Sequence, residues 1–450
     1  MSSVNLPGPK VRLLNTAKFL TDPYATSLAW RDRYGDPFMA RTVNGDVVVT
    51  GRAEHIRTIF AASPDTYTPF GVAAIGPVVG PRSLLILGGE AHKKERKLLM
   101  PPFHGARMKA YADMMRDVAR RHFSAAASDG APTTMQKLAQ DITLEVIVRA
   151  IFGVTDDAEI AKIAEGSLAV VEAAHPAFLF APWLQRSFGG LGPYAKFKKV
   201  FDASDADLAM LVEARRRRGP GDDILWMLLE ARHDDGSPMA DEDIRDELRT
   251  LIVAGHETTA MTLSFLVDYL ARDAAALARV REEVQSGQST LIDSAIKETL
   301  RLRPIVTESM RTLAKPMRLG DVEIPAGVHV SASMVLAHYD PERWPSPERF
   351  VADRFVGLSP APTDYLPFGG GHRRCIGAAF AEMELRIVAS ALFAELDVAL
   401  LSSATSRPVR RNLTMGPKDG VPVRLALPAR ASGHAHKMAA GAESAPARVA

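Results

Sequence analysis

The sequence reads Phe368-Gly369-Gly370-Gly371-His372-Arg373-Arg374-Cys375-Ile376-Gly377 between residues 368 and 377, and this stretch contains the only cysteine of the 450-residue chain. A lone cysteine is most often a small, inert, buried residue. Here three successive glycines let the backbone approach another group closely, and two arginines directly before the sulfur favour its thiolate form. One sulfur cannot make a structural zinc site, which needs four ligands. The sulfur could act as a nucleophile or as the axial ligand of a haem.

Residues 376–385 read as the first turns of a helix of small and apolar residues, and a thiolate at a helix N-terminus gains from the helix dipole. At Phe368, Gly371, Arg373, Cys375 and Gly377 the stretch resembles the haem-binding loop of the cytochrome P450 monooxygenases. The resemblance implies a b-type haem (iron protoporphyrin IX) whose iron is bound by the thiolate of Cys375. It also implies that the neighbouring loop residues contact the haem, namely Phe368, Gly369, Arg373 and Gly377.

The composition of the chain is that of an ordinary globular protein. Charged residues make up 24% and hydrophobic residues 47%, and the net charge of +2 gives no argument for nucleic acid as a partner. One cysteine excludes an intrachain disulfide framework and fits a reducing cytoplasm. No run of about 18 uncharged apolar residues exists, and the first ten residues lack a signal-peptide pattern. We therefore expect a cytoplasmic protein without a transmembrane anchor, similar to the soluble bacterial members of the family.

The resemblance implies a mainly α-helical fold with a small β region, arranged as a triangular single haem domain. We expect this domain to span residues 10–430, after an N-terminal arm (residues 1–9) and before a disordered tail (residues 431–450) that is rich in Ala, Gly, Ser and Pro. Strand signals are few. Asn44-Gly45 between two strand-like runs, residues 37–43 and 46–50, predicts a hairpin.

Residues 69–87 are predicted to form an apolar loop, and such loops commonly cover or bind something. A helix begins near Gly89, and His92 and Arg96 are four residues apart, so that they share one of its faces. These residues could simply form a solvated basic surface. The resemblance instead assigns both to the haem propionates, with Arg311 as a third basic partner.

The longest helical pattern runs from Asp241 to about Arg272 and begins with an acidic turn, as helix N-termini prefer. A mid-helix Gly255 costs about 1 kcal/mol relative to alanine, and Thr258 can bond back to the carbonyl of Ala254. Such local defects often mark functional sites.

His256 and Glu257 resemble half of a zinc-protease motif, but Ala260 stands where the second histidine would be. The segment resembles the oxygen-binding groove of the cytochromes P450. The resemblance places Ala254 and Gly255 beside the haem and makes Glu257 and Thr258 the catalytic pair that delivers protons.

Glu298 and Arg301 lie three residues apart on one predicted helix face. Such pairs are common on helix surfaces. The resemblance implies that this pair is buried and structural, with a third member from a downstream loop. Arg354 fits that third position best, and Arg349 is the weaker alternative.

Several segments that the resemblance places around the distal side of the haem carry few charges, and ordinary core packing is their alternative interpretation. The expected substrate-pocket residues are Phe70, Val72, Leu84, Ile252, Val253, Ile305, Val306, Thr307, Thr414 and Met415. Arg303 and Glu308 flank one pocket segment and could reach a polar end group of a substrate. A bulky apolar stretch at residues 176–184 could form a mobile mouth of the pocket or simply pack locally.

The sequence therefore predicts a monooxygenase that inserts one oxygen atom from O2 into a lipophilic small molecule, such as a fatty acid, terpenoid, steroid or macrocycle, by hydroxylation or epoxidation. We expect a monomer that receives electrons from a separate ferredoxin or flavodoxin with its reductase. Basic side chains expected near the proximal side would dock that acidic partner, namely Lys93, Lys94, Lys97, Arg107, Arg373 and Arg374. A peroxide-driven peroxygenase and a haem sensor or carrier are the alternatives, and the Glu257–Thr258 pair argues against both.

Overall fold

The computed structural model describes residues 4–174, 184–187, 189–411 and 414–428. The apolar stretch at residues 176–184, apart from its last residue, and the predicted tail at 431–450 lie outside the described residues. The helices are α1 (Arg12–Thr21), α2 (Pro23–Tyr34), α3 (Ala53–Ala61), α4 (Val72–Val79), α5 (Gly89–Leu99), α6 (Ala106–Asp129), α7 (Met135–Phe152), α8 (Asp157–Ala173), α10 (Pro193–Arg218), α11 (Ile224–Glu230), α12 (Asp241–Leu270), α13 (Ala274–Gln285), α14 (Thr290–Leu302), α15 (Met334–His338) and α16 (Ala378–Glu395).

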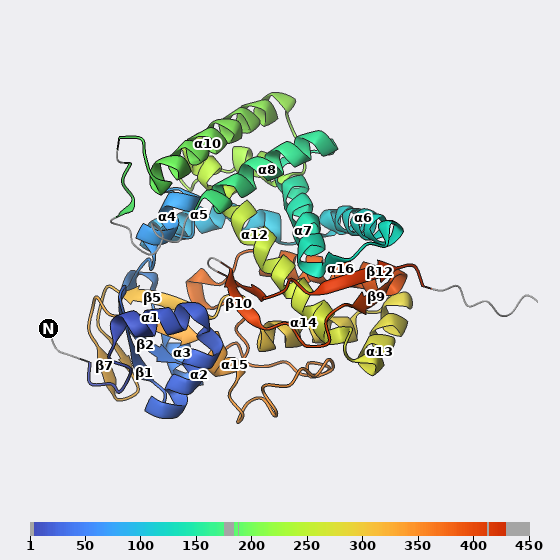
Figure 1. The fold of residues 1–450 in the computed structure, drawn as a ribbon. Coiled ribbons are helices and arrows are strands. Elements are labelled where there is room, and N and C mark those ends of the chain that lie inside the picture. The colour runs from blue at the N-terminus through green and yellow to red at the C-terminus, as the bar shows by residue number, and fades with distance from the viewer. Residues whose placement is uncertain (1–3, 175–183, 188, 412–413, 429–450) are drawn as a thin grey trace, which may run out of the picture.

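The strands are short and form several small sheets (Figure 1). They are β1 (Phe38–Thr42), β2 (Gly45–Thr50), β3 (Tyr67–Thr68), β4 (Thr133–Thr134), β5 (Glu308–Leu313), β6 (Met317–Leu319), β7 (Val322–Ile324), β8 (His329–Ser333), β9 (Asp397–Leu400), β10 (Pro408–Arg411), β11 (Thr414–Pro417) and β12 (Pro422–Ala426).

The largest sheet has five strands in the order β1-β2-β8-β5-β3, and only its β2–β8 pair is parallel. Its first hairpin is the predicted one, because Thr42 pairs with Gly45 across the turn. Side chains alternate between the two faces of β5, so that Arg311 and Glu308 point to opposite sides. In Figure 1 this sheet lies at one side of the molecule, with α1, α2 and α3 beside it.

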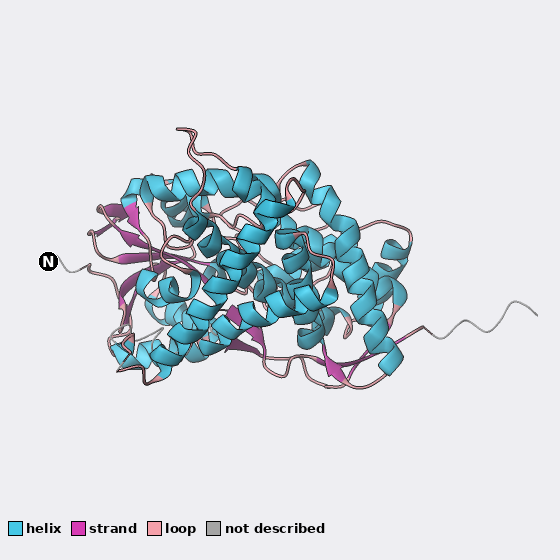
Figure 2. Ribbon diagram, turned by 90° about the horizontal axis from the view of Figure 1, so that it is seen from above, coloured by secondary structure: helices cyan, strands magenta, loops and turns pink. Residues whose placement is uncertain are grey.

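Helix α12 runs through the helical part of the molecule, where it packs against α7, α14 and α16 (Figures 1 and 2). It begins at the predicted Asp241 and ends two residues before the predicted end. By length and composition α12 could cross a membrane, yet 72% of its apolar window is buried inside the protein. Its hydrophobicity is therefore accounted for by its place in the core.

Two sequence-based expectations about local structure are wrong. The predicted loop at residues 69–87 contains the helix α4, even though Pro77 lies inside it. A helix of only eight residues loses little from one missing N–H, and glycines in positive-φ conformations, Gly71 and Gly80, bound it at both ends. The basic run at residues 215–218 complements the helix dipole at the end of α10 and is expected from the sequence to be solvated. Arg215 is instead buried and pairs with Asp223 at 2.7 Å.

The hydrophobic interior divides into separate clusters. The largest includes residues from α6, α7, α12, α14 and α16. A smaller one, which we call the roof cluster, joins α4, α8 and α10 and consists of the buried residues Val78, Val170, Ala174 and Phe197. The roof cluster is separate from the main core, and α12 contacts all three of its helices.

Candidate functional site

The loop before α16 presents the sulfur of Cys375. Two of its glycines, Gly369 and Gly371, have φ values of +65°, which side chains rarely adopt. A Cβ atom on Gly370 would lie 2.2 Å from the ring of Phe60, so the close approach of the loop to α3 also requires glycine. The backbone N–H of Cys375 donates to the carbonyl of Phe368 at 2.9 Å, which closes the loop.

Cys375 has accessible surface, yet protein atoms surround it closely enough that burial raises the pKa of its thiol. A hydrogen bond from the backbone N–H of Gly377 and the charges of Arg374 and Arg96 oppose that effect without overcoming it. Arg374 therefore favours the thiolate, as expected from the sequence, but desolvation has the larger effect on the pKa of the thiol. Binding of a metal cation to the sulfur would supply the missing stabilisation of the thiolate.

Five basic side chains meet beside this loop. His92 and Arg96 from α5, Arg311 from β5, and His372 and Arg373 from the loop affect one another electrostatically. Burial and the surrounding positive charges lower the pKa of His92 to about 3 and that of His372 to about 4. Burial, with Arg373 nearby, lowers the pKa of Arg311 to about 10.

No carboxylate among the described residues forms an ion pair with these five groups. The three arginines donate to backbone carbonyls, and the two histidine rings contact each other edge-on at 5.8 Å. Arg96 donates to the carbonyl of Arg374 at 2.7 Å, and Arg373 donates to Leu85 at 3.2 Å and also to Leu87. A buried excess of positive charge calls for an anionic ligand, because unpaired buried charges are costly. The two propionates of a haem would provide that charge, and the nearby sulfur would provide the axial ligand. The residues present therefore fit a haem.

Helix α12 exposes surface where a core helix would be covered. Ala254 is accessible at mid-helix, whereas its near neighbours Ile252 and His256 are buried. The hydroxyl of Thr258 donates to the carbonyl of Ala254 at 2.9 Å. Gly255 lies on the face of α12 that packs against α7, since a Cβ atom there would lie 3.2 Å from Ile147. The exposure of Ala254 and the partial exposure of Thr258 indicate a hollow beside the middle of α12, while Gly255 lets α7 and α12 approach each other.

Glu257 and Thr258 point in different directions because consecutive helical residues are about 100° apart. Glu257 is half-buried and interacts with Thr414 and Arg411 on the β10–β11 hairpin. Burial raises the pKa of Glu257, while the hydrogen bond with Thr414 and the charge of Arg411 act in the opposite direction. The two members of the predicted pair are therefore adjacent in sequence but have separate surroundings.

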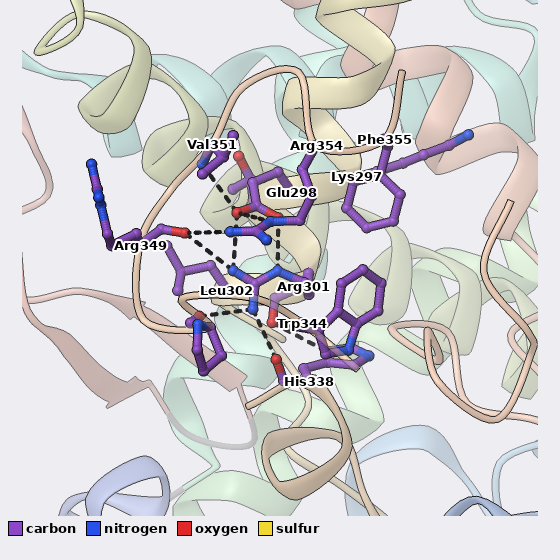
Figure 3. Close-up of polar contacts among 12 residues, drawn as sticks. Lys297, Glu298, Arg301, Leu302, His338, Trp344, Arg349, Val351, Arg354 and Phe355 are labelled. Carbon is purple, nitrogen blue, oxygen red and sulfur yellow. Dashed lines mark hydrogen bonds and ion pairs between the residues drawn. The ribbon is translucent and has the colours of Figure 1, made fainter. Parts of the chain in front are cut away.

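Glu298, Arg301 and Arg354 form a buried network (Figure 3). Glu298 accepts from Arg301 at 2.7 Å and from Arg354 at 2.9 Å, and the side chains of Glu298 and Arg301 are 0% exposed. Arg349 contributes its backbone carbonyl to this network rather than its side chain. Arg301 also donates to the carbonyl of His338, which ties α14 to α15.

The expected pocket residues separate into two groups. Val72 and Val306 expose 42% and 43% of their surface, and Val253 is half-buried next to Ala254. Others pack within the protein: Phe70 lies edge-on to His329 at 5.1 Å. Buried residues among those expected are Leu84, Ile252, Ile305, Thr307, Thr414 and Met415. Met415 belongs to a core cluster with two tyrosines, and Thr414 faces Glu257.

Arg303 and Glu308 were expected to be able to reach a polar end group of a substrate. Both side chains are instead hydrogen-bonded to other residues of the protein. Arg303 donates to the hydroxyl of Tyr339 at 2.6 Å and lies over the rings of Tyr24 and Tyr269. Glu308 accepts from the hydroxyls of two β8 serines at 2.6 and 2.8 Å. The suggestion that they bind the substrate is therefore wrong.

The basic residues expected to dock an electron donor are only partly available. Lys97 pairs with Asp234 and Arg107 pairs with Asp222, while the guanidinium of Arg373 points to backbone carbonyls inside the protein. In the part of the chain that the structure describes, Lys94 and Arg374 are exposed and have no ion-pair partner.

Sequence reasoning assigned no role to His372, which joins the basic group through a ring contact with His92 at 5.8 Å. Its position between a glycine and two arginines was the available signal. Two buried carboxyls, Glu95 on α5 and Glu247 on α12, were also missed. Nothing local distinguishes them from surface glutamates.

Comparisons with known proteins agree with this site. The cytochrome P450 family model matches residues 11–421. Cytochrome P450 138 of Mycobacterium tuberculosis and Mycobacterium bovis is 34% identical over 405 residues, which cover 86% of this chain and 88% of that protein. Cytochrome P450 135A1 of Mycobacterium tuberculosis is 32% identical over 440 residues, covering 95% and 96% of the two chains. The retinoic acid-bound cyanobacterial CYP120A1 has a TM-score of 0.83 at 24% identity and covers 94% of this chain and 100% of its own.

This chain belongs to the cytochrome P450 family, of the bacterial type. It is accordingly a haem-dependent monooxygenase, an oxidoreductase that uses O2 and electrons from a redox partner. The predicted fold class, mainly α-helical with a small β region, is confirmed.

Proposed function

We propose that the substrate of this monooxygenase is a lipophilic small molecule bound in the hollow beside Ala254. Val72 and Val306 support this proposal, because both expose large apolar surfaces in segments that flank α12. Exposed hydrophobic surface within a concave site typically binds apolar ligands. CYP120A1, a structural relative, is described with bound retinoic acid, which is itself a lipophilic molecule. Fatty acids, terpenoids, steroids and macrocycles remain the candidate classes.

In this proposal the haem is b-type, Cys375 binds its iron, and His92, Arg96 and Arg311 bind its propionates. The positive charge of the arginines, which no carboxylate among the described residues compensates, is the observation that supports the assignment. The lowered pKa of His92 leaves its ring neutral, so it would contribute a ring N–H rather than a charge. When bound, the haem supplies the activation of O2 and the insertion of one oxygen atom into the substrate. The chain supplies the orientation of the haem, the apolar pocket and the protons.

Thr258 and Glu257 handle those protons. The hydroxyl of Thr258 lies beside the accessible surface of Ala254, and by turning its O–H away from the Ala254 carbonyl it could hold a proton toward that surface. Glu257 is a half-buried carboxyl whose pKa is raised by burial, so it holds a proton more readily than an ordinary glutamate, as a general acid requires. We also propose that the protein acts as a monomer in the cytoplasm, and that a ferredoxin or flavodoxin with its reductase supplies the electrons.

Binding of alkyl-chain homologues, read from the Soret band of the holoprotein, tests the substrate class. Each added methylene should gain roughly 0.8 kcal/mol, about fourfold in affinity, until the pocket is full. Val306→Ala should weaken this series, whereas Leu358→Ala, at an exposed position away from α12, should leave it unchanged. Affinity that is flat with chain length, together with tight binding of small charged metabolites, would show that the substrate class is wrong.

A further inference from the structure

The hairpin formed by β10 and β11 is packed directly against α12 at the level of Glu257. A Cβ atom on Gly416 would lie 2.5 Å from the sulfur of Met261, which is one helical turn after Glu257. The N–H of Met415 also donates to the carbonyl of Ile305 at 2.9 Å. β11 is thus fixed between α12 and the segment that carries Val306, and all four of its residues are buried. The contact between Thr414 and Glu257 is therefore held by backbone packing on both sides.

The hydroxyl of Thr414 has one hydrogen and two acceptors within reach. It donates to the carbonyl of Arg411 at 3.0 Å, and the carboxyl group of Glu257 lies close enough for this hydroxyl to lower its pKa. A hydroxyl can donate once and accept twice. When Glu257 is protonated, its O–H donates to Thr414, and Thr414 donates to Arg411. When Glu257 is ionised, the hydroxyl of Thr414 can turn and donate to the carboxylate.

The side chain of Arg411 provides the charge that the ionised state needs. Its terminal nitrogen donates to the carbonyls of Pro417 at 3.1 Å and Lys418 at 3.2 Å, the second at an exposed position. Its Nε is buried and has no hydrogen-bond partner among the described residues. Arg411 is the charged side chain whose field reaches Glu257. A free buried donor beside a carboxyl group stabilises the carboxylate when it forms.

We propose that Thr414 and Arg411 are positioning residues that stabilise Glu257 in both of its protonation states, so that Glu257 can release a proton and take another. The inference rests on the proposed function of Glu257. A buried carboxyl without these partners would be trapped in the protonated form, because burial disfavours the charged form. In each cycle Glu257 gives one proton to the interior hollow and regains one from water, and no electrons are transferred.

The test is an infrared titration of the Glu257 carboxyl in the holoprotein, with Glu257→Gln to assign the band. Thr414→Val and Arg411→Gln should each move the titration midpoint to higher pH, whereas Thr414→Ser, which keeps the hydroxyl, should restore it. The pH profile of the coupling between electron consumption and product should move in the same direction. Unchanged titration in Thr414→Val and Arg411→Gln would overturn the proposal.

Two controls distinguish the proposed role of Thr414 and Arg411 from a packing defect of the hairpin and from a failure of the proposed function of Glu257. Arg410→Gln is the control for the hairpin, because Arg410 points to backbone carbonyls of α1 rather than to Glu257. If the titration moves as expected but Glu257→Gln leaves coupling unchanged, the positioning of Glu257 stands and its role in proton delivery is wrong. If Arg410→Gln shifts the titration as much as Arg411→Gln, the effect is one of hairpin packing, and the proposal is overturned.

Discussion

Thr258 and Thr262 make the same hydrogen bond one turn apart in α12. Thr258 donates to the carbonyl of Ala254 at 2.9 Å, and Thr262 donates to the carbonyl of Thr258 at 2.9 Å. Their surroundings differ, because Thr258 adjoins accessible surface while Thr262 is buried in the core. Substituting each threonine in turn therefore distinguishes two effects. Loss of the hydrogen bond affects the helix in both variants, whereas loss of the hydroxyl beside Ala254 occurs only at Thr258.

Thr258→Ala should retain the haem and substrate binding but uncouple the reaction, because the hydroxyl that delivers protons is lost. Electrons should then appear as hydrogen peroxide rather than as product, and the peroxide released per electron donor consumed measures this. Thr262→Ala should remain coupled although it loses an equivalent hydrogen bond. Equal uncoupling in both variants would assign the effect to the helix and remove Thr258 from the mechanism.

Ligation by Cys375 has a spectroscopic signature. The reduced, carbon monoxide-bound protein should show the strongly red-shifted Soret band of a thiolate-ligated haem, because the sulfur donates electron density to the iron. Cys375→His should move the band to the position typical of histidine ligation. A histidine-type spectrum from the intact, folded wild-type protein would exclude the thiolate.

The buried network at Glu298 should be essential for folding. Glu298→Ala strands two guanidinium groups, Arg301 and Arg354, and breaking a buried pair costs about 3–5 kcal/mol. Little haem-loaded protein should be recovered, and urea unfolding should show the loss of stability. Asp141→Ala breaks the exposed pair with Lys137, so it should change stability by less than about 1 kcal/mol. Similar effects of the two variants would show that burial does not strengthen the Glu298 network.

Glu247 on α12 and Glu95 on α5 are both buried carboxyls. Glu247 accepts the N–H of Leu84 at 2.6 Å, and each carboxyl has one buried oxygen without a partner among the described residues. Burial raises the pKa of Glu247 to about 9, and the nearby Glu95, Asp246 and Asp243 raise it further against the hydrogen bond from Leu84. Burial, with Asp243 nearby, raises the pKa of Glu95 to about 7.

Both carboxyls bind their proton more tightly in the folded protein than in the unfolded chain. Their contribution to stability is therefore fully present below the ordinary glutamate pKa and is lost as the pH rises toward 9. Glu247→Gln should remove much of this loss, because an amide mimics the protonated carboxyl. Urea unfolding between pH 5 and pH 9 measures it, with the exposed Glu242→Gln on the same helix as control. An unchanged pH slope in Glu247→Gln would refute this assignment.

Electron delivery should depend on exposed basic residues in two opposite ways. Arg374→Glu removes a free positive charge and should slow reduction by an acidic protein donor. Asp234→Asn releases Lys97 from its ion pair and should accelerate reduction, by a small factor since exposed pairs contribute up to about 1 kcal/mol. Both effects should shrink with salt, and dithionite reduction should stay normal. A salt-independent defect would indicate misfolding instead.

Features defined by a short spacing could be predicted from the sequence. The Asn44-Gly45 hairpin and the central helix follow from turn chemistry and periodicity, which are local properties. The positions of Cys375 and of His92 with Arg96 likewise depend only on a few neighbouring residues. The mainly apolar residues 141–152 predict a helix, yet α7 begins earlier, at Met135. Its first turn is set by a cap at Thr134 and by hydrogen bonds to the distant residues Gly420 and Val421.

The direction of side chains in irregular segments could not be predicted. Phe70 packs on His329, and Met415 packs with Tyr24 and Tyr339, because tertiary contacts between distant segments orient them. Burial raises the pKa of the Cys375 thiol by more than the neighbouring arginines lower it, and the sequence alone does not give burial.

The roof cluster has a consequence for how the selectivity of this protein could diverge. Val78, Val170 and Phe197 pack with one another rather than with the main core, whose residues support the haem loop and the Glu298 network. If the substrate binds as proposed, beside Ala254, substitutions in the roof cluster should change the cover of the pocket and leave the haem-binding scaffold intact. Libraries directed to these positions should therefore yield a larger share of folded, haem-loaded variants with altered substrate preference than libraries directed to α12 or α16.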